Sequence, residues 1–571
     1  MVKLFPTACG TKIEVRAGFK NKDKVKRIPG RTWNQAKKVW EVPIINLPQV
    51  WEEFPEAMAH PSVEVVYAEQ TEHLQKAVNA KHQADAERQF PGLKGTLYPF
   101  QAVGRSFLGT LRPKEGAILG FDMGLGKTIT ALAEFVRLYG RGELKRCLVV
   151  CPASLKYATW EKELNKWTEL TYQIIDGDAK GVKVNGKTLR GKPLRKHQYQ
   201  QDAVVLVTNY ESFLHDKDAI PTLDDTWCLI LDEAHRIKNP KAKTTKNLFK
   251  KGKQAGRKFL LTGTPLENSV TELWSLVDMC RPGMLGPYSK FKDRYIIEDY
   301  WGNEVSPNHA RLPELREKLE PITFRKRKED ALPDLPPLVE QEYWVYMTPD
   351  QKKLYTEIQS GIVEMTDGDF TYMDILAQLT RLQQVLDSPA LLRDVLDRPD
   401  LPVDSGKLTE LDNVLRDVGE NKAIVFSQYR TMADILYARL CKTFGNEAVR
   451  YISGNTATAD RGTYQNEFQD DDRVRFIVIT TAGNYGLDLY RASYVICYDQ
   501  LFNPQKMSQV LSRAHRNGAQ QKVTAVHLVT KDSYEERKLK ILDKKKRLFN
   551  AMIDVEDFKL TPEELRYLLG D

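Results

Sequence analysis

Residues 120–130, GFDMGLGKTIT, combine the residue types that bind a nucleotide phosphate. Glycines leave backbone N–H groups open to an anion at a helix N-terminus, Lys127 can reach the β and γ phosphates, and the Thr128 hydroxyl can ligate magnesium. The run lies between an apolar AIL and a helix-forming ALAEFVRL, which is where such a loop must lie. Phe121 replaces the first glycine of the general pattern, so a glycine-rich turn without a ligand is the alternative. The residues that we expect to hold the nucleotide are Asp122, Met123, Gly124, Leu125, Gly126, Lys127 and Thr128.

Two carboxylates follow a buried strand that the sequence predicts at residues 227–231, WCLIL. Asp232 and Glu233 open the tetrapeptide DEAH at the carboxyl end of this run. A carboxylate at that edge of a sheet, beside a phosphate loop, can hold magnesium, and its neighbour can polarise the attacking water. The same tetrapeptide also occurs on helices with no such role, but its place after a buried strand favours the site. We therefore expect Thr128 and Asp232 to be metal ligands, with Lys127, Asp232 and Glu233 catalytic.

Both sets of residues depend on strands that end at one edge of a sheet. Short apolar, β-branched runs alternate with helical stretches and form two series along the chain. The first series comprises residues 147–151, 203–208, 227–231 and 258–261, and the second 423–426, 475–479, 494–498 and 523–529. Continuous apolar strands that alternate with helices predict parallel sheets covered on both faces. Two such series predict an α/β protein with two lobes.

Other segments complete the expected organisation. The strand signal disappears between residues 282 and 405, where helices such as 312–319 and 373–386 and the proline-rich LPDLPPL indicate helical insertions and an inter-lobe connector. The N-terminal residues carry strand-like KIEVR and KVWEVP around a basic turn, and residues 71–89 favour a helix. We expect a small α+β domain at 1–65, a helical linker at 66–92, the first lobe at 93–340, the second at 341–548 and a C-terminal helical extension at 549–571.

The order and spacing of DMGLGKT, DEAH and LTGTPLEN, residues 261–268, resemble those of Swi/Snf-type ATPases in helicase superfamily two. The resemblance extends over roughly residues 93–548. It implies two tandem RecA-like lobes, ATP and Mg²⁺ as cofactors, and a DNA-dependent ATPase. It also implies that Gln101, in LYPFQ, contacts adenine. The residues implied to touch DNA are Ser154, Lys156, Asn209, Tyr210 and Thr481. For Trp160 and Trp167, in the motif after the phosphate loop, we favour packing.

The run QVLSRAHRNGAQ, residues 509–520, offers the arginines that such an ATPase needs from its second lobe. An arginine from a neighbouring lobe neutralises charge in the transition state and is worth about 10³ to 10⁵ in rate. On a helix Arg513 and Arg516 are spaced i, i+3 and leave the same face, so both can reach one phosphate. A solvated helix face is the alternative, but the run resembles the last motif of the family. Upstream, TTAGNYGLDL resembles the motif that couples the ATP cleft to DNA, and we expect Gly486 and Asp488 to contact the nucleotide.

The N-terminal segment KNKDKVKRIPGRTWNQAKKVW, residues 20–40, interleaves aromatic and basic residues. It resembles the HepA-related (HARP) domain of annealing helicases, which implies a substrate-recognition surface. Tryptophans stack on bases while cations contact phosphates, which suits single strands and junctions. The candidate DNA contacts are Lys26, Arg27, Arg31, Trp33 and Trp40. The alternative is that Trp33 and Trp40 form the core of a small β domain.

Bulk composition excludes function classes but does not select one. The 571 residues carry 85 Lys and Arg against 77 Asp and Glu, and this excess of +8 permits nucleic-acid binding without arguing for it. Seven scattered cysteines without a CxxC pair predict small core residues in a reducing compartment. No window approaches the ~20 apolar residues of a bilayer crossing, so we expect a cytoplasmic protein without a membrane partner. The KKKR run at 544–547 favours a solvated helix face or a backbone contact.

Together these features predict an ATP-dependent translocase on double-stranded DNA that remodels or reanneals branched or forked DNA. A strand-separating helicase and a remodeller that displaces proteins such as polymerase from DNA are the alternatives. Single-stranded-DNA-binding or replication proteins are the protein partners left open. A DNA-binding scaffold with a degenerate ATPase is disfavoured because Lys127, Asp232, Glu233 and Arg516 are intact.

Overall fold

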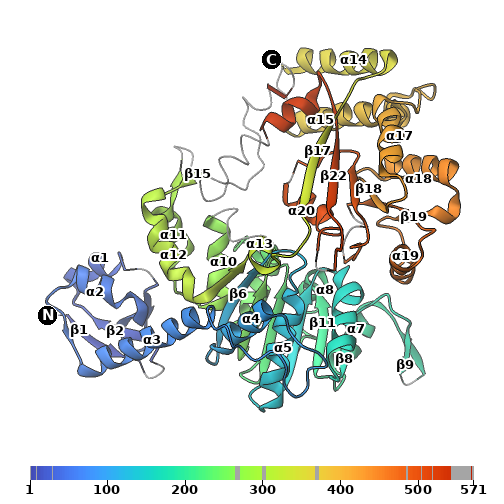
Figure 1. Cartoon of the computed structure of the whole chain (residues 1–571). Helices are drawn as coiled ribbons and strands as arrows, with labels where there is room; N and C mark the ends of the chain where they lie inside the picture. The colour runs from blue at the N-terminus through green and yellow to red at the C-terminus, as the bar shows by residue number, and fades with distance from the viewer. Residues whose placement is uncertain are drawn as a thin grey trace. The chain divides into compact units, whose positions relative to one another are not determined.

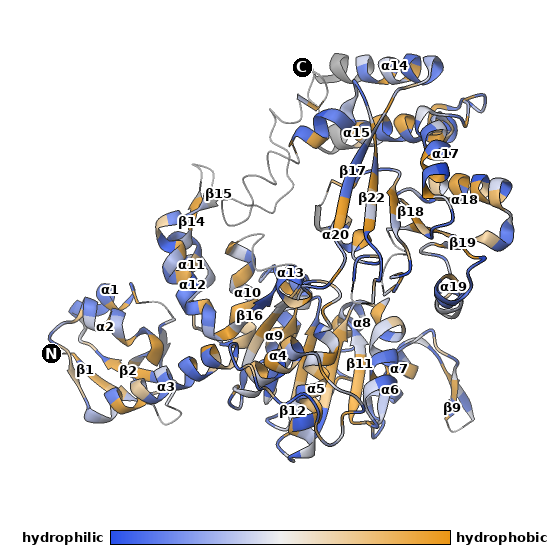
Figure 2. Ribbon diagram, in the orientation of Figure 1, coloured by the Kyte–Doolittle hydropathy of each residue, from blue (hydrophilic) through white to orange (hydrophobic). Residues whose placement is uncertain are grey.

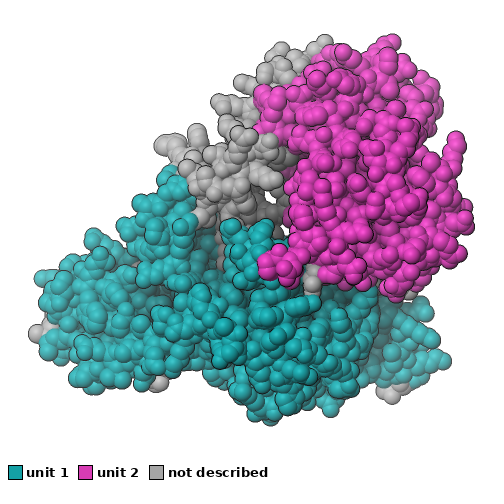
Figure 3. Space-filling model, in the orientation of Figure 1, with its two compact units in different colours: residues 1–331 teal, residues 332–571 magenta. Residues whose placement is uncertain are grey.

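The computed structural model describes residues 2–7, 10–28, 30–184, 186–263, 270–298, 304–366, 372–481, 483, 486–502, 504–516, 518–541 and 567–568. The chain folds into two compact units, Met1–Ala331 and Leu332–Asp571 (Figure 3). The KKKR run and all of the expected C-terminal extension except 567–568 lie outside the described residues. Among the described helices, none combines the length and the hydrophobicity that a bilayer crossing requires.

A small α+β domain opens the first unit (Figure 1). Its five-stranded sheet has the order β3-β4-β2-β1-β5. The elements are β1 (Lys3–Pro6), β2 (Lys12–Arg16), α1 (Lys22–Val25), β3 (Thr32–Asn34), β4 (Val39–Pro43), α2 (Leu47–Glu53) and β5 (Met58–Ala59). Aliphatic side chains such as Leu4, Val15 and Val42 form its core. The two strand-like runs that the sequence indicated are β2 and β4, so this part of the fold is confirmed.

Helix α3 (Pro61–Ala80) joins this domain to the first lobe. Val63 in its first turn packs in the core of the small domain. Near its other end, His73 is buried and forms a 2.9 Å hydrogen bond with Glu115 of the lobe. The expectation of a helix over residues 71–89 within a separate linker was therefore wrong in its bounds. The helix starts earlier, because its first turn completes the small domain, and residues 81–92 continue without helix.

The first lobe is built on a seven-stranded sheet in the order β16-β6-β13-β12-β7-β11-β8, in which every neighbouring pair is parallel. Its strands are β6 (Glu115–Phe121), β7 (Arg146–Cys151), β8 (Tyr172–Ile174), β11 (Val205–Asn209), β12 (Trp227–Asp232), β13 (Arg257–Leu261) and β16 (Thr323–Lys326). The main helices around it are α4 (Pro99–Gly109), α5 (Lys127–Gly140), α6 (Lys162–Trp167), α7 (Gly191–Tyr199), α8 (Tyr210–His215), α9 (Lys243–Gly252) and α10 (Val270–Cys280). Because the strands are parallel, their carboxyl ends meet at one edge of the sheet.

Two additions interrupt this lobe. A β-hairpin, β9 (Val182–Val184) and β10 (Lys187–Leu189), lies between β8 and α7. Between α10 and β16 the chain forms α11 (Tyr288–Tyr295), β14 (Ile296–Glu298), β15 (Glu304–Pro307) and α12 (Leu312–Leu319), and α13 (Lys328–Ala331) closes the unit. The helix expected at 312–319 is thus present with the expected bounds.

The second unit contains a six-stranded parallel sheet in the order β17-β22-β21-β18-β20-β19. Its strands are β17 (Leu338–Val345), β18 (Ala423–Ser427), β19 (Val449–Ile452), β20 (Phe476–Thr480), β21 (Tyr494–Cys497) and β22 (Val523–Thr530). Its helices are α14 (Pro349–Thr366), α15 (Tyr372–Asp387), α16 (Arg393–Leu396), α17 (Gly406–Val418), α18 (Arg430–Phe444), α19 (Thr458–Asp470) and α20 (Pro504–Leu511), and residues 534–541 are also helical.

Burial on both faces explains the continuous apolar strands. In β18, Ala423 and Val425 belong to one buried cluster while Ile424 and Phe426 belong to another. Successive side chains of a strand point to opposite faces, so both faces of this sheet are covered. The central strands are correspondingly orange along their length in Figure 2. The expected fold class, an α/β protein with two parallel-sheet lobes, helical insertions and a small N-terminal α+β domain, is confirmed.

Strands at the sheet edges were missed, and this corrects two expectations. The strand signal does not end at residue 282, because β16 and β17 lie between 282 and 405. Both are edge strands with charged, partly exposed side chains, so they lack the continuous apolar run of a central strand. The division between the units also falls at 331/332 and not at 340/341, because β17 pairs with β22 of the second sheet.

Charged groups are buried in the core of the second unit. Lys407 is fully buried and its ammonium contacts Asp387 at 2.9 Å and also Glu535. These two carboxylates raise the pKa of Lys407 although burial opposes it. The described cysteines are free thiols and all except Cys441 are buried, as we expected of core residues.

Candidate active site

The phosphate loop follows β6 and ends where α5 begins, at Lys127. Gly124 and Gly126 have left-handed backbone angles, with φ of 85° and 76°, which a glycine adopts without strain. The Lys127 ammonium donates hydrogen bonds to the carbonyls of Phe121 at 3.0 Å and Asp122 at 3.5 Å, so it lies over the loop. A lysine held at the N-terminus of a 14-residue helix concentrates positive potential for an anion.

Neighbouring side chains approach the glycines at and beside the loop so closely that a larger residue would not fit at Gly126 or Gly263. A Cβ at Gly126 would lie 2.4 Å from Gln101 Nε2, and a Cβ at Gly263 would lie 3.0 Å from Lys127 Nζ. Gly263 follows β13, so the LTG of the LTGTPLEN run borders the loop, while residues 264–268 lie outside the described part of the chain. Bare backbone around a lysine is the arrangement that a triphosphate requires. The residues present therefore fit ATP; the Thr128 hydroxyl and the Asp232 carboxylate would hold a magnesium ion, which would neutralise phosphate charge.

Gln101 and Asp122 brace this loop. Gln101 is buried; its Oε1 accepts a hydrogen bond from Tyr98 N at 3.0 Å and its Nε2 donates to Leu125 O at 3.1 Å. One oxygen of Asp122 accepts a hydrogen bond from Lys328 N at 2.9 Å, which holds the loop against the segment after β16. Both side chains thus have partners within the chain, and their contacts with the nucleotide stay predictions.

Asp232 ends β12 as expected and is almost fully buried. Its Oδ1 accepts a hydrogen bond from Glu233 N at 3.0 Å, and its Oδ2 accepts one from the Trp160 indole at 2.9 Å. Burial, together with the nearby Glu233 charge, raises the pKa of Asp232 to about 6. A carboxylic acid with a raised pKa, whose two oxygens are held by hydrogen bonds, is typical of a functional site.

Glu233 has a left-handed backbone with φ of 51°, a conformation that side chains other than glycine rarely adopt. Such strain costs on the order of 1–3 kcal/mol and concentrates at functional sites. Its Oε2 lies 3.4 Å from His235 Nδ1. The turn thus gives two adjacent carboxylates different surroundings, one buried and one partly exposed, while their roles as metal ligand and as the group that activates water stay predictions.

Trp160 has a contact at the site that sequence reasoning missed. We expected packing, and the indole is indeed fully buried, but it also donates the hydrogen bond that orients Asp232. The π-helical turn Lys156–Glu161 after β7 delivers it there, and β7 pairs with β12. The available signal was a tryptophan in the segment that follows β7. This signal could be used only if it was known that β7 pairs with β12, the strand that ends in Asp232.

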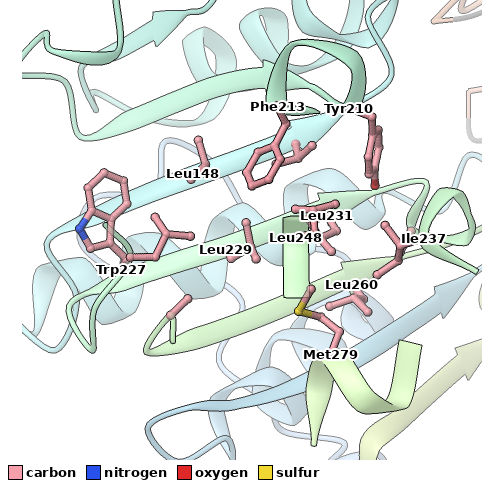
Figure 4. Close-up of a cluster of buried hydrophobic side chains, with 14 of the residues drawn as sticks. Leu148, Tyr210, Phe213, Trp227, Leu229, Leu231, Ile237, Leu248, Leu260 and Met279 are labelled. Atoms are coloured by element: carbon pink, nitrogen blue, oxygen red, sulfur yellow. The ribbon is translucent and has the colours of Figure 1, made fainter. Parts of the chain in front are cut away.

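Two of the expected DNA contacts are contradicted by their burial. Tyr210 lies among buried side chains, and its hydroxyl donates to the carbonyl of Asp232 at 2.8 Å (Figure 4). Lys156 is also buried, and its ammonium donates to Ile175 O at 3.1 Å. Both side chains turn into the lobe and complete its core and the end of β12, so neither side chain is placed to contact a DNA backbone.

Other expected DNA contacts lie where strands end. Asn209 ends β11, and its Oδ1 accepts a hydrogen bond from Ser212 N at 2.7 Å, which caps α8. Ser154 follows β7 at the same edge and is half-buried. In the second unit Thr481 follows β20 and is half-buried. These three contacts stay predictions.

The two arginines are not on a helix, so the expectation that they share a helix face was wrong. Helix α20 ends at Leu511, and a hydrogen bond from Arg516 N to Ala514 O at 3.1 Å closes a tighter turn. Arg513 Nη1 donates to Leu487 O at 3.2 Å, and Arg516 forms an ion pair with Asp488. Both arginines therefore meet the segment beside Gly486, which has a left-handed φ of 72°. The turn brings together residues that the sequence had assigned to two separate motifs.

The small N-terminal domain exposes one of its two candidate tryptophans. Trp33 is 46% exposed and packs edge to face on the half-buried Trp40, with ring centroids 5.1 Å apart. Lys26 and Arg27 are exposed, whereas Arg31 is half-buried, donates to Ile28 O at 3.0 Å, and has its pKa lowered by burial. The alternative that both tryptophans form the core is wrong for Trp33, because aliphatic residues fill that core.

Comparison with known proteins matches two domains in this chain. Residues 47–391 match the SNF2-related domain and residues 406–518 match the helicase conserved C-terminal domain. YwqA of Bacillus subtilis, whose name assigns it to ATP-dependent helicases/translocases, is 31% identical over 518 residues, which are 88% of this chain and 54% of that protein. The ISWI chromatin-remodeling complex ATPase ISW1 of Saccharomyces cerevisiae is 28% identical, over 83% of this chain and 42% of that protein.

A solved structure is also similar. The SWI2/SNF2 ATPase core of Sulfolobus solfataricus in complex with dsDNA is 28% identical and matches 85% of this chain and 99% of that chain, with a TM-score of 0.40. The chain spans about half the length of the curated relatives it matches. The SNF2-related domain alone covers more than half of the residues, so the chain belongs to the SNF2-related family of helicase-like ATPases.

Proposed function

We propose that the chain is a DNA-dependent ATPase that translocates on double-stranded DNA. The observation that carries the proposal is the carboxyl edge of the first sheet. This edge bears the phosphate loop and the Asp232–Glu233 pair, and also Ser154 and Asn209 at the ends of neighbouring strands. A nucleotide and a nucleic-acid strand bound at the same edge would be mechanically coupled, because the same strand ends position both.

The residues of the chain have distinct tasks in ATP hydrolysis. Lys127 holds negative charge on the phosphates, Asp232 supplies a fixed oxygen for the metal ion, and Glu233 polarises the attacking water. Arg513 and Arg516 supply the positive charge that stabilises the transition state, where one such arginine is worth about 10³ to 10⁵ in rate. Contacts with the DNA backbone carry no sequence information, so binding is sequence-independent and sensitive to salt.

The finer part of the proposal concerns the DNA substrate. We assign recognition of forked or branched DNA, and with it remodelling or reannealing, to the N-terminal domain. The exposed Trp33, together with the exposed Lys26 and Arg27 of the same domain, supports this, because bases that leave the duplex at a fork can stack on an accessible indole. Single-stranded-DNA-binding or replication proteins would be its partners at such sites.

The motor is tested by ATP hydrolysis with no nucleic acid, blunt duplex, single strand, forked DNA and duplex RNA. Wild type should respond to duplex DNA, whereas Glu233→Gln should bind ATP and hydrolyse it at least 100-fold more slowly, by the magnitude typical of general-base loss. The control is Glu169→Gln, which removes an exposed carboxylate that pairs with Lys94. Normal turnover by Glu233→Gln, or no response of wild type to any DNA, would contradict the proposal.

The N-terminal assignment needs point variants, because removing residues 1–65 would cut helix α3 (Pro61–Ala80) within its first turns and expose the part of the helix that packs on the small domain. Trp33→Ala combined with Lys26→Gln and Arg27→Gln should lower fork stimulation to the level of blunt duplex. Lys76→Gln, on the exposed face of α3, is the control. Equal stimulation by fork and duplex in wild type would leave a general translocase. Displacement of a strand from a tailed duplex would indicate a helicase.

A further inference from the structure

The hairpin β9–β10 lies outside the motifs that define the ATPase. It projects from the first unit beside β8 and α7 (Figure 1). Its register pairs Lys187 with Val184, Thr188 with Lys183 and Leu189 with Val182. Cross-strand partners lie on the same face, so Val182 and Val184 share one face and Lys183 points to the other.

The root of the hairpin is firmly anchored in the lobe. Gly191 N donates to Gly177 O at 3.0 Å, which closes the base of the loop. Asp176 accepts a hydrogen bond from Tyr157 at 2.8 Å and lies 3.4 Å from the Lys156 ammonium. This explains why Lys156 is buried: it fixes the start of the hairpin instead of facing a ligand.

A second anchor holds helix α7, which follows the returning strand. Arg195 donates two hydrogen bonds to Asp216, at 2.6 and 2.9 Å. A bidentate pair of this kind fixes direction as well as position. The hairpin therefore leaves the lobe with a defined orientation, as a preformed binding element does.

Positive charge is concentrated on this element. Residues 177–197 contain seven Lys and Arg and one acid, Asp178, whereas the whole chain has 85 against 77. Six of the seven are exposed, and none of these six has an ion-pair partner within the described residues. The six are Lys180, Lys183, Lys187, Arg190, Lys192 and Lys196. Unpaired cations repel one another at this spacing, and an anionic partner would relieve the repulsion.

We propose that this hairpin grips the phosphate backbone of duplex DNA, as an extension of the edge that carries Ser154 and Asn209. This inference rests on the proposed function. Strand β8 is parallel to β11, so the hairpin leaves from the carboxyl edge of the sheet, at which β11 ends in Asn209.

The chemistry of the hairpin favours duplex backbone over other partners. Residues 180–192 contain no aromatic side chain on which the base of a single strand could stack. A protein interface centres on aromatic anchors more often than on lysines, and residues 180–192 contain four lysines and no aromatic side chain.

The test is a triple variant, Lys183→Gln, Lys187→Gln and Arg190→Gln, with a matched control of equal charge. The control replaces Arg141, Lys145 and Lys250 by Gln; these three are exposed, lack ion pairs within the described residues, and lie toward the opposite, amino edge of the sheet. Binding of a fluorescent blunt duplex is measured from about 50 to 200 mM salt. The slope of log affinity against log salt should be smaller by about 2–3 for the hairpin variant and unchanged for the control.

Hydrolysis gives an independent readout. The hairpin variant should need more duplex for half-maximal ATPase, with the basal rate and the rate at saturating duplex unchanged. The charge-preserving variant Lys183→Arg, Lys187→Arg and Arg190→Lys should restore the wild-type slope. A wild-type slope in the Gln variant would overturn the inference, as would a loss of strand displacement with intact duplex binding, which would make the hairpin a wedge. If the wild-type protein neither binds duplex DNA nor hydrolyses ATP faster in its presence, the proposed function itself is contradicted, independently of the hairpin.

Discussion

The Trp160 indole is the most informative side chain to perturb in the first unit. Trp160→Phe keeps an aromatic ring in a fully buried position but removes the donor that holds Asp232 Oδ2 at 2.9 Å. Asp232 then keeps one hydrogen bond to its carboxylate, from Glu233 N. The acid would be free to rotate and less stable in its charged form, which is the form that binds a metal ion.

The size of the effect follows from the strength of the lost interaction. A hydrogen bond to a charged acceptor contributes about 1.5–3 kcal/mol, and a free-energy change of about 1.4 kcal/mol is a factor of ten. If that stabilisation is needed when MgATP is bound and hydrolysed, kcat/KM should fall roughly 10- to 100-fold. The Mg²⁺ concentration for half-maximal rate should rise in the same direction, because Asp232 is its expected ligand.

The assay is steady-state ATP hydrolysis with saturating duplex DNA across a Mg²⁺ series. Trp167→Phe is the matched control, because Trp167 packs close to Gly95 and its indole nitrogen makes no hydrogen bond within the described residues. This control should stay within about threefold of wild type. A folded Trp160→Phe enzyme with wild-type kcat/KM and Mg²⁺ dependence would refute the role of the indole in positioning Asp232.

Three further changes test other parts of the structure. Tyr210→Phe should leave the affinity for duplex and its salt slope unchanged while costing about 0.5–1.5 kcal/mol of stability, because the hydroxyl is buried; a smaller salt slope would restore the DNA contact. Lys407→Met should destabilise the second unit by about 3–5 kcal/mol in calorimetry, since it leaves Asp387 and Glu535 as unpaired buried carboxylates; an unchanged melting temperature would contradict this. Burial and nearby arginines lower the pKa of His73 from 6.5 to about 4, so the unfolded chain takes up a proton first and stability falls as pH drops from 6.5 toward 4. His73→Gln should weaken that loss when melting is compared at about pH 7.5 and about pH 5, and an identical pH dependence would count against it.

The central strands and the phosphate loop could be predicted because their signals are local. A strand covered on both faces must be apolar throughout. The phosphate loop is a short run in which glycines stand next to a lysine, and the structure gives Gly124 and Gly126 the φ angles of 85° and 76° that only glycine adopts easily. The edge strands β16 and β17 could not be found in this way, since an exposed face replaces the apolar run by charges. Composition alone did not separate a short charged strand from the surrounding loops.

Long-range partners account for the errors at the site. Trp160 and Asp232 are 72 residues apart, and Lys156 meets Asp176 only because β7 and β8 both flank β11 in the sheet. From sequence, a lysine in a DNA-contacting motif is expected to face the DNA. In the fold the same lysine anchors a hairpin, and the exposed cations of that hairpin lie further along the chain.

The arginine turn of the second unit brings two predicted motifs into contact through an element that the sequence did not predict. The i, i+3 spacing gave a helix face, whereas the turn beyond Leu511 directs Arg513 and Arg516 to the segment at Leu487 and Asp488. An arginine that supplies charge to a transition state must release any carboxylate that it holds. In the proposed mechanism, Asp488 and the phosphate therefore compete for Arg516. Exchange of Asp488 for a phosphate would then link the state of the nucleotide to the backbone that follows β20.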